Sequence, residues 1–318
     1  MNSKDTAQAP FFGGVDVGGT NIKLGIVDDQ GQCRAYRSIP TEEERGALAA
    51  MQRSAQQLRE MVSELGLTWD QVVAVGLATP GTMDISQGIL LQPHNLPSWW
   101  EFGIRDCLHE QVNKPVSFAN DANAAAFGEY WVGSGSAYDS IALFTLGTGV
   151  GGGVIIGDLS IDGENSAGSE VGHTIIDFSP HARKCGCGQT GHLEAYASAR
   201  GVVQRAEEQL AKSPQSSLKR RLDAGEELTP LMVAQEAEAG DELALQLVLD
   251  TAMYLGVGAV NVMHIVDPGV VVFGGAMTFG GPDSELGQRF LQRIRDEVAA
   301  RAFPVLAQKT PIHLSLIH

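Results

Sequence analysis

The chain has 318 residues, of which 43% are hydrophobic and 19% are charged, and its formal net charge is -16 at pH 7. This length and apolar content can support two domains with full cores. The acidic balance argues against a general nucleic-acid or polyanion surface. The N-terminal "MNSKDTAQAP" has no apolar signal core, and glycine or proline breaks the longest apolar stretches short of a membrane span. We expect a cytoplasmic protein without membrane or nucleic-acid partners.

The sequence of the first third of the chain predicts several strands followed by a helix. After about ten residues expected to be disordered, the stretch 11–40 has the pattern of strand, glycine turn, strand, acidic turn and strand. A helix is predicted near residues 44–65. Its apolar residues recur at roughly helical spacing: Leu48, Met51, Leu58, Met61 and Leu65. Next, "VVAVGLATPGTMD" predicts a buried strand that runs into a Thr-Pro-Gly loop.

The stretch "KPVSFANDANAAAFGEYWVG" predicts a strand that ends at Asn120-Asp121, followed by an alanine-rich helix. From residue 141 the pattern of the first hairpin returns. "IALFTLGTGVGGGVIIGDLSIDG" then repeats strand, glycine loop, strand and acidic turn, which indicates a weak internal duplication. Residues 199–262 are predicted to be mostly helical, with a charged, solvated connection at 213–229. "PGVVVFGGAM" predicts a buried strand, and a helix follows at 287–302.

Two glycine loops directly follow buried strands. Glycine lets backbone N–H groups converge on an anion, because no Cβ blocks the approach. The first loop adds Asp16, Thr20 and Lys23, which are the groups that Mg²⁺ and a polyphosphate require. The second offers Thr148 and no charge. Each loop alone also fits an ordinary hairpin turn, but two at equivalent positions favour a nucleotide site. Neither matches the Walker or Rossmann glycine pattern.

Asp121 follows an apolar strand and precedes a helix. A carboxylate there can reach a ligand site at the end of a sheet, while the helix amides help to keep it ionised. Taken alone, Asp121 is better explained as a helix N-cap.

The four cysteines do not predict a disulfide framework. Cys185 and Cys187 are separated by one residue, so a bridge between them would be badly strained. Without a signal peptide, this CxC unit points to a metal site. Cys33 and Cys107 are interpreted as small buried hydrophobic residues.

Seven segments together resemble the ROK family of sugar kinases and sugar-responsive repressors. In chain order they are "DVGGTNIK", "ATPG", "FANDANAAAFGE", "LGTGVGGG", "GSEVGH", "CGCGQTGHLEAYAS" and "VVFGGAM". The resemblance implies an α/β, two-lobed actin-like ATPase (ribonuclease H-like) fold with an interlobe cleft. It implies a small lobe at 1–119, to which 303–318 returns, and a large lobe at 120–302 that carries a zinc-binding loop.

The resemblance also implies the residues of the site. Asp121 would be the general base that draws a proton from a sugar hydroxyl. The implied sugar contacts are Gly81, Thr82, Asn120, Asp121, Glu170, His173 and Glu194. The implied ATP and Mg²⁺ contacts are Asp16, Gly18, Gly19, Thr20, Lys23, Gly147, Thr148, Gly149, Gly274 and Gly275. Carboxylates and amides suit a neutral polyol better than an anionic substrate.

A structural zinc ion is implied by the CxC region. In the family, one histidine and three cysteines bind this zinc; here His173, Cys185 and Cys187 match, and His192 stands at the third cysteine position. Imidazole is a good zinc ligand, so we expect His192 to replace the thiolate. His173 could bind metal through one ring nitrogen and a sugar hydroxyl through the other. The alternative is that His192 merely caps a turn and no metal binds.

The expected activity is transfer of the ATP γ-phosphate to the 6-hydroxyl of a hexose, with glucose as the acceptor, in a homodimer. An N-acetylhexosamine kinase is the close alternative, since the pocket around carbon 2 is not visible in the motifs. A sugar-sensing regulator is the alternative from another class. It would carry a DNA-binding domain before the first glycine loop, which only about a dozen residues precede. The family usually continues past "IHLSLI" with a Gly-Ala-rich helix on the small lobe, whereas this sequence ends at His318.

Overall fold

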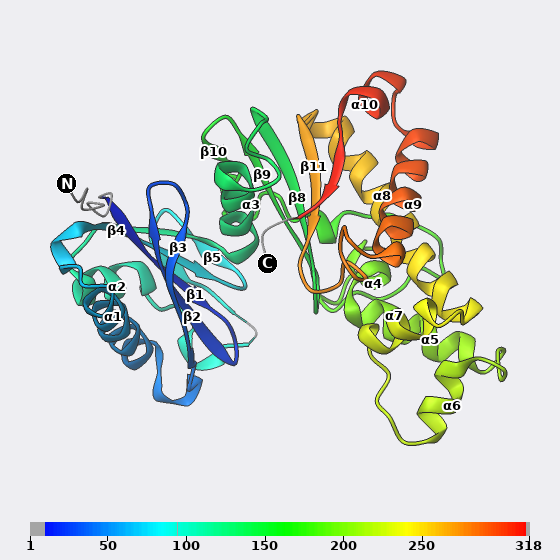
Figure 1. Ribbon diagram of the computed structural model, residues 1–318, viewed down its shortest axis with the longest axis horizontal. Coiled ribbons are helices and arrows are strands. Elements are labelled where there is room, and N and C mark those ends of the chain that lie inside the picture. Colours follow the sequence, from blue (N-terminus) through cyan, green and yellow to red (C-terminus); the bar gives the residue numbers. More distant parts are fainter. Residues whose placement is uncertain (1–9, 94, 316–318) are drawn as a thin grey trace, which may run out of the picture. The chain divides into compact units, whose positions relative to one another are not determined.

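The computed structural model describes residues 10–93 and 95–315 and divides them into two compact units (Figure 1). The first unit takes residues up to Ala124 together with Asp162–Gly168, and the second takes Ala125–Ile161 and the chain from Ser169 onward. Each unit has its own sheet and helices, so the expected α/β class is confirmed. The division lies inside helix α3 (Asp121–Val132), a few residues beyond the expected boundary at 119/120. The N-terminal residues expected to be disordered lie almost wholly outside the described range.

The first unit is a five-stranded sheet in the order β3-β2-β1-β4-β7, with a separate β5-β6 hairpin. Its strands are β1 (Phe11–Val17), β2 (Asn21–Asp28), β3 (Cys33–Pro40), β4 (Val72–Thr79), β5 (Met83–Asp84), β6 (Ile89–Leu90) and β7 (Val116–Asn120). Its helices are α1 (Ala47–Glu64) and α2 (Ile104–Val112), with 3-10 turns at Glu43–Arg45, Trp69–Gln71 and Pro97–Trp99. β2 runs antiparallel to both β1 and β3, whereas β1, β4 and β7 run parallel.

Helices α1 and α2 cover one face of this sheet (Figure 1). Alternate residues of β1 are buried, which is the two-residue period of a strand with one face on the core. Met51, Leu58 and Met61 of α1 are buried, as their spacing predicts. Leu48 and Leu65 are exposed, so the apolar stripe is narrower than the sequence suggested.

The second unit has a five-stranded sheet in the order β10-β9-β8-β11-β12. Its strands are β8 (Ser140–Leu146), β9 (Val150–Ile156), β10 (Leu159–Ser160), β11 (Val270–Gly274) and β12 (Ile312–Leu314). The helices after α3 are α4 (Glu194–Ala197), α5 (Ala199–Leu210), α6 (Ser217–Asp223), α7 (Pro230–Glu238), α8 (Glu242–Val266), α9 (Glu285–Arg301) and α10 (Pro304–Lys309), with a 3-10 turn η4 (Val171–His173).

The two sheets share one strand topology. In each, a central strand (β1 or β8) pairs antiparallel with the next strand of the chain and parallel with a later strand on its other side. This agrees with the duplication that the repeated hairpin pattern predicted. Each glycine loop therefore joins the central strand of its sheet to the antiparallel neighbour.

Both faces of the second sheet are covered. Helices α5, α7, α8 and α9 form the larger core on one face, where Phe144 of β8 and Phe273 of β11 stack with ring centroids 4.9 Å apart. Helix α3 covers the other face and packs through Ala126 against β8, β9 and β11 (Figure 1). The two phenylalanines are completely buried. Their stacked rings lie on the helix-covered face of the sheet, so both the sheet and the helical layer depend on this contact.

Two expectations about helices need correction. The connection 213–229 is not simply solvated, because it contains α6, whose Leu218 is completely buried. By length and composition α8 could cross a membrane, with a mean hydropathy of 1.6 over its best window, so an apolar stretch of that length does exist. Leu247, Leu255 and other apolar residues of α8 are buried in the second core. The helix thus has the environment of a core helix.

The C-terminal segment does not return to the first unit. Within the described residues, 303–315 belong to the second unit, where β12 pairs parallel with β11 and Leu314 lies opposite Phe273. Ile312 and Leu314 are buried in the second core. The expectation that 303–318 joins the small lobe is therefore wrong for these residues, because the apolar side of β12 completes the second sheet instead.

We predict that Phe273→Ala lowers the free energy of unfolding by about 3–5 kcal/mol, because it removes a fully buried aromatic ring and leaves a cavity. Phe178→Ala is the matched control, since that ring is 97% exposed, and its effect should stay within about 0.5 kcal/mol. Urea unfolding followed by circular dichroism measures both. Equal losses in the two variants would contradict the placement of Phe273 in the core.

Candidate functional site

The carboxyl ends of three parallel strands meet at one edge of the first sheet. Asp16 of β1 lies opposite Ala78 of β4, and Thr79 of β4 lies opposite Asn120 of β7. Ligands of open α/β sheets bind beyond this edge. Asp121 follows Asn120 directly, so Asp16 and Asp121 extend from the two strands that flank β4.

Asn120 and Asp121 also begin helix α3. The amide of Ala122 donates to Asn120 Oδ1 at 2.9 Å and to Asp121 Oδ1 at 2.8 Å. Both side chains therefore take part in capping the helix, which was the alternative role considered for Asp121. Asp121 is nevertheless exposed. A carboxylate held at a helix N-terminus and open to solvent can still meet a ligand.

The first glycine loop is held by a buried threonine that the sequence analysis did not single out. Thr41 donates its hydroxyl to the carbonyl of Gly18 at 2.7 Å and its amide to the carbonyl of Thr20 at 2.9 Å. Gly19 and Thr20 are exposed. The loop is thus fixed from behind, and its outer side is open.

Asp16 and Lys23 lie side by side next to this loop. Lys23 Nζ is 3.3 Å from Asp16 Oδ2, and their side chains are 58% and 44% exposed. An ion pair this exposed contributes little to stability. Both groups can therefore exchange their mutual contact for a metal ion and a phosphate oxygen at small cost.

Gly81 and Thr82 lie in the loop between β4 and β5. Gly81 has a positive φ of 87°, and a Cβ there would lie 2.8 Å from Pro93 Cα. Thr82 accepts hydrogen bonds from the amides of Leu91 and Gln92, at 3.0 and 3.2 Å. Both residues are exposed, in a turn whose backbone is fixed by these contacts.

In the second unit, the two glycine segments lie at the same sheet edge. Gly274 of β11 pairs with Thr145 of β8, and Met277 donates its amide to the carbonyl of Leu146 at 3.2 Å. The loop Gly147–Gly149 starts directly after Leu146. The chain therefore brings together the two segments that the resemblance assigns to the nucleotide.

Glu194 of α4 connects the second glycine loop with Cys185. Its Oε2 accepts a hydrogen bond from the amide of Val150 at 3.1 Å, and its Oε1 accepts one from Cys185 Sγ at 3.4 Å. A Cβ on Gly149 would lie only 2.4 Å from the same Oε2, so only glycine admits this contact. Glu194 was expected to meet the sugar, and both of its oxygens have partners within the protein.

Glu170 and His173 flank a tight contact with strand β9. A Cβ on Gly172 would lie 1.9 Å from the carbonyl oxygen of Val150, so the turn η4 reaches the strand only because this residue is glycine. Glu170 is exposed at the start of the turn, and His173 ends it half-buried. The turn directs Glu170 to solvent and His173 toward the cysteines.

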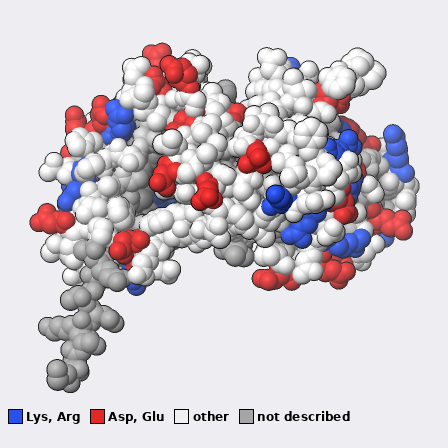
Figure 2. All heavy atoms as spheres, turned by 90° about the horizontal axis from the view of Figure 1, so that it is seen from above, with Lys and Arg blue, Asp and Glu red and all other residues white. Residues whose placement is uncertain are grey.

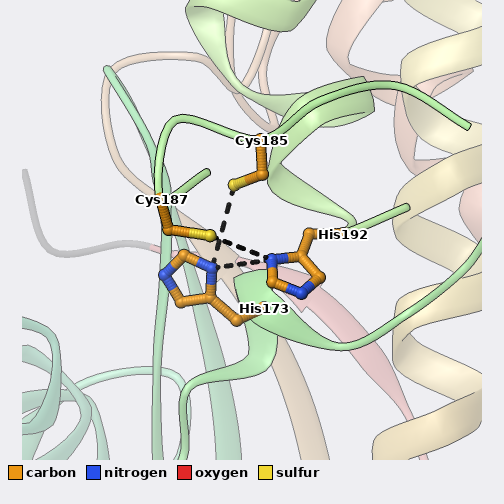
Figure 3. Close-up of side chains that lie close together, drawn as sticks. All are labelled: His173, Cys185, Cys187 and His192. Carbon is orange, nitrogen blue, oxygen red and sulfur yellow. Dashed lines mark hydrogen bonds between the residues drawn. The ribbon is translucent and has the colours of Figure 1, made fainter. Parts of the chain in front are cut away.

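His173, Cys185, Cys187 and His192 form a compact cluster (Figure 3). Their ligand atoms all lie within 4.8 Å of one another. His192 Nδ1 is 3.2 Å from His173 Nδ1 and 3.4 Å from Cys187 Sγ, and Cys185 Sγ is 3.9 Å from His173 Nδ1. Zinc bonds at tetrahedral angles place neighbouring nitrogen and sulfur ligands roughly 3.3–3.8 Å apart. The spacing is compatible with such a site, and Nε2 of each imidazole is left outside it.

Burial favours the neutral forms of Cys185 and His192. It raises the pKa of the Cys185 thiol to about 12, and the nearby Glu194 carboxylate acts in the same direction. Burial also lowers the pKa of His192, and the neighbouring His173 adds to this effect. A divalent cation reverses the preference of a buried thiol, because it stabilises the thiolate.

Tyr196 holds the loop that carries Cys185. Its hydroxyl donates to Asp177 Oδ2 at 2.6 Å and accepts from the amide of Arg183 at 2.8 Å. The sequence analysis did not assign it a role, although it stands in the quoted segment "HLEAYAS" two residues after Glu194. The sequence signal that could have found Tyr196 was its position close to Glu194, a predicted site residue.

The two remaining cysteines differ from their expected burial. Cys33 is exposed and Cys107 is half-buried. Cys33 begins the edge strand β3, in which no residue is fully buried. Its interpretation as a buried hydrophobic residue is therefore wrong.

The charges of the described residues do not form a basic binding face in the view of Figure 2. Acidic side chains are spread over the face drawn there, and basic side chains occur among them.

Comparison with known proteins supports one family over most of the chain. The family model described as "ROK family" matches residues 12–310. A curated glucokinase of Halalkalibacterium halodurans is 32% identical over 307 residues, which cover 96% of this chain and 91% of that protein.

Solved structures agree with the sequence comparison. A ROK hexokinase from Thermus thermophilus has a TM-score of 0.78 and 30% identity, covering 96% of this chain and 93% of that one. A ROK family glucokinase from Streptomyces griseus, solved with glucose and AMPPNP, has a TM-score of 0.75 and 28% identity, covering 97% and 94%. The expected actin-like ATPase fold is confirmed by these neighbours.

We predict that Gly172→Ala lowers the free energy of unfolding by about 2–3 kcal/mol, because its Cβ would overlap the Val150 carbonyl. Gly128→Ala is the matched control, since a Cβ at that position of α3 meets nothing within 4 Å. It should stabilise the protein by about 0.5–1 kcal/mol. Denaturant titration gives both values, and changes of the same sign would contradict the close approach of η4 to β9.

Proposed function

The chain belongs to the ROK family, and from this membership we propose that it is a glucokinase, which transfers the γ-phosphate of ATP to the 6-hydroxyl of glucose. A curated glucokinase, a ROK hexokinase structure and a ROK glucokinase structure support an ATP-dependent hexose kinase. The observation that carries the choice of glucose is 32% identity to a glucokinase over 96% of the chain.

We assign the role of general base to Asp121. As the 6-oxygen attacks the γ-phosphorus, its proton passes to the Asp121 carboxylate, a new O–P bond forms, and the bond from the γ-phosphorus to ADP breaks. The exposed position of Asp121 at the edge of the first sheet supports this role. Asn120 would hold a neighbouring hydroxyl. Gly81, Thr82, Glu170 and His173 would complete the hexose site.

The phosphate chain would be bound by the two glycine loops. Asp16 would hold Mg²⁺, and Lys23 with the amides of Gly18–Thr20 would neutralise phosphate oxygens. Gly147–Gly149 and Gly274–Gly275 would contact the rest of the nucleotide. The exposure of Asp16 and Lys23 supports this assignment.

We further propose that His173, Cys185, Cys187 and His192 bind a structural zinc ion. The support is a closed set of two thiols and two imidazoles at suitable mutual distances. Bound zinc would fix the loop around Cys185. A homodimer and a cytoplasmic location stay predictions.

The first test is a coupled ADP-release assay with Mg-ATP against glucose, N-acetylglucosamine, N-acetylmannosamine, mannose and fructose. We expect glucose to give the highest kcat/KM. Asp121→Asn should lower kcat by about 100- to 10,000-fold, because a general base contributes this much. Asp29→Asn, an exposed carboxylate in the turn after β2, should leave the rate unchanged. If an N-acetylated sugar has the highest kcat/KM, that sugar and not glucose is the acceptor. If Asp121→Asn keeps full activity, Asp121 is not the general base.

The zinc proposal is tested by metal analysis of purified protein. The wild type should hold about one zinc ion per chain, and Cys187→Ser should hold almost none, with a lower melting temperature. Cys33→Ser is the matched control, because Cys33 is exposed and lies outside the cluster. A wild type reconstituted with zinc that retains none, or a Cys187→Ser variant that retains a full equivalent, would contradict the site.

A further inference from the structure

Residues 161–169 form a compact loop that leads directly into Glu170. Its base is closed by Ser169 Oγ, which donates to the carbonyl of Ile161 at 2.9 Å, and by the amide of Gly168, which donates to the carbonyl of Asp162 at 2.6 Å. Compact loops with closed ends are frequently functional. Because Glu170 directly follows Ser169, the conformation of the loop determines the position of the Glu170 backbone.

Two serines in this loop have a backbone conformation that normally requires glycine. Ser166 has a φ of 53° and Ser169 a φ of 64°. Such residues persist only where their surroundings hold them, and they are common at functional sites. Ser166 is held by its own hydroxyl, which accepts a hydrogen bond from the amide of Ile85 at 2.9 Å.

Asn123 provides the second anchor of the loop. Its Nδ2 donates to Asp162 Oδ1 at 2.8 Å. The side chain is only 5% exposed, and its Oδ1 is buried without a hydrogen-bond partner in the described part of the chain. Leaving a buried acceptor unsatisfied is unfavourable. Burial of this acceptor therefore costs stability at a position two residues beyond Asp121.

We propose that Asn123 is a positioning residue for the hexose site. It fixes Asp162 at the start of the loop, Ser166 fixes the tip, and together they hold the strained backbone that presents Glu170. This inference rests on the proposed function, in which Asp121 and Glu170 meet the hexose. Because Asn123 acts through Asp162 and the loop that leads to Glu170, we expect its removal to change hexose binding and not ATP binding.

The test compares steady-state kinetics of Asn123→Ala with the wild type. We expect the KM for glucose to rise about tenfold while kcat and the KM for ATP stay within about twofold, because a loss of uniform substrate binding appears in KM alone. Glu164→Ala is the matched control, since Glu164 is exposed in the same loop, and should behave as the wild type. A merely structural asparagine would lower the melting temperature and leave both KM values unchanged, which would overturn the proposal.

A double-mutant cycle tests the link between Asn123 and Asp162. If the two residues act as a unit, Asn123→Ala combined with Asp162→Ala raises the KM for glucose no more than the larger single change. Additive increases would contradict the shared role. Ser166→Ala removes the contact with Ile85 and should show the same selective rise in the KM for glucose, and it carries the test if Asn123→Ala does not fold.

Calorimetry with glucose separates this inference from the kinase proposal. If the wild type turns over no hexose, the proposed reaction fails, and the positioning role is judged from glucose binding alone. Binding about tenfold weaker in Asn123→Ala than in Glu164→Ala would then support it. Equal affinities, or no glucose binding by the wild type, would overturn it.

Discussion

Strand direction decides where the polar groups of this chain can meet. Each sheet has one central strand whose carboxyl end lies beside the carboxyl ends of parallel neighbours, and a glycine loop follows the central strand. Asp16 and Asn120 reach the same edge of the first sheet only because β1, β4 and β7 run parallel. Gly147 and Gly274 reach one edge of the second sheet for the same reason. A reversal of any of these strands would place the site residues at opposite ends of a sheet.

In the second unit, helix α4 links the glycine loop to the loop that carries the cysteines. The Glu194 carboxylate accepts from the Val150 amide after the glycine loop and from Cys185 in the cluster. Two residues later, Tyr196 binds both ends of the segment that precedes Cys185. One short helix therefore couples the second glycine loop to the cysteine loop. A change at the cluster has a direct path through Glu194 to the backbone of Val150.

The local parts of this architecture could be predicted from the sequence, whereas the distant contacts could not. Alternating burial and glycine turns specify both hairpins, and the polar end of β7 specifies the start of α3. The sequence analysis gave no element to the β5-β6 hairpin or to α2, since both are short and depend on packing against the first core. Placing β12 requires knowing which sheet has an open apolar edge. The contact of Asn123 with Asp162 joins residues 39 positions apart, and nothing local in either segment indicates it.

The histidine at position 192 changes the charge of the cluster and not merely its ligand type. A zinc ion with two thiolates and two neutral imidazoles has no net charge, whereas three thiolates would leave one negative charge. The Glu194 carboxylate is 3.4 Å from Cys185 Sγ, a distance at which like charges repel strongly inside a protein. A zinc cluster without net charge would lower this repulsion relative to a cluster with three thiolates. With less repulsion from the cluster, the carboxylate would more easily keep its hydrogen bond with the Val150 amide at the second glycine loop.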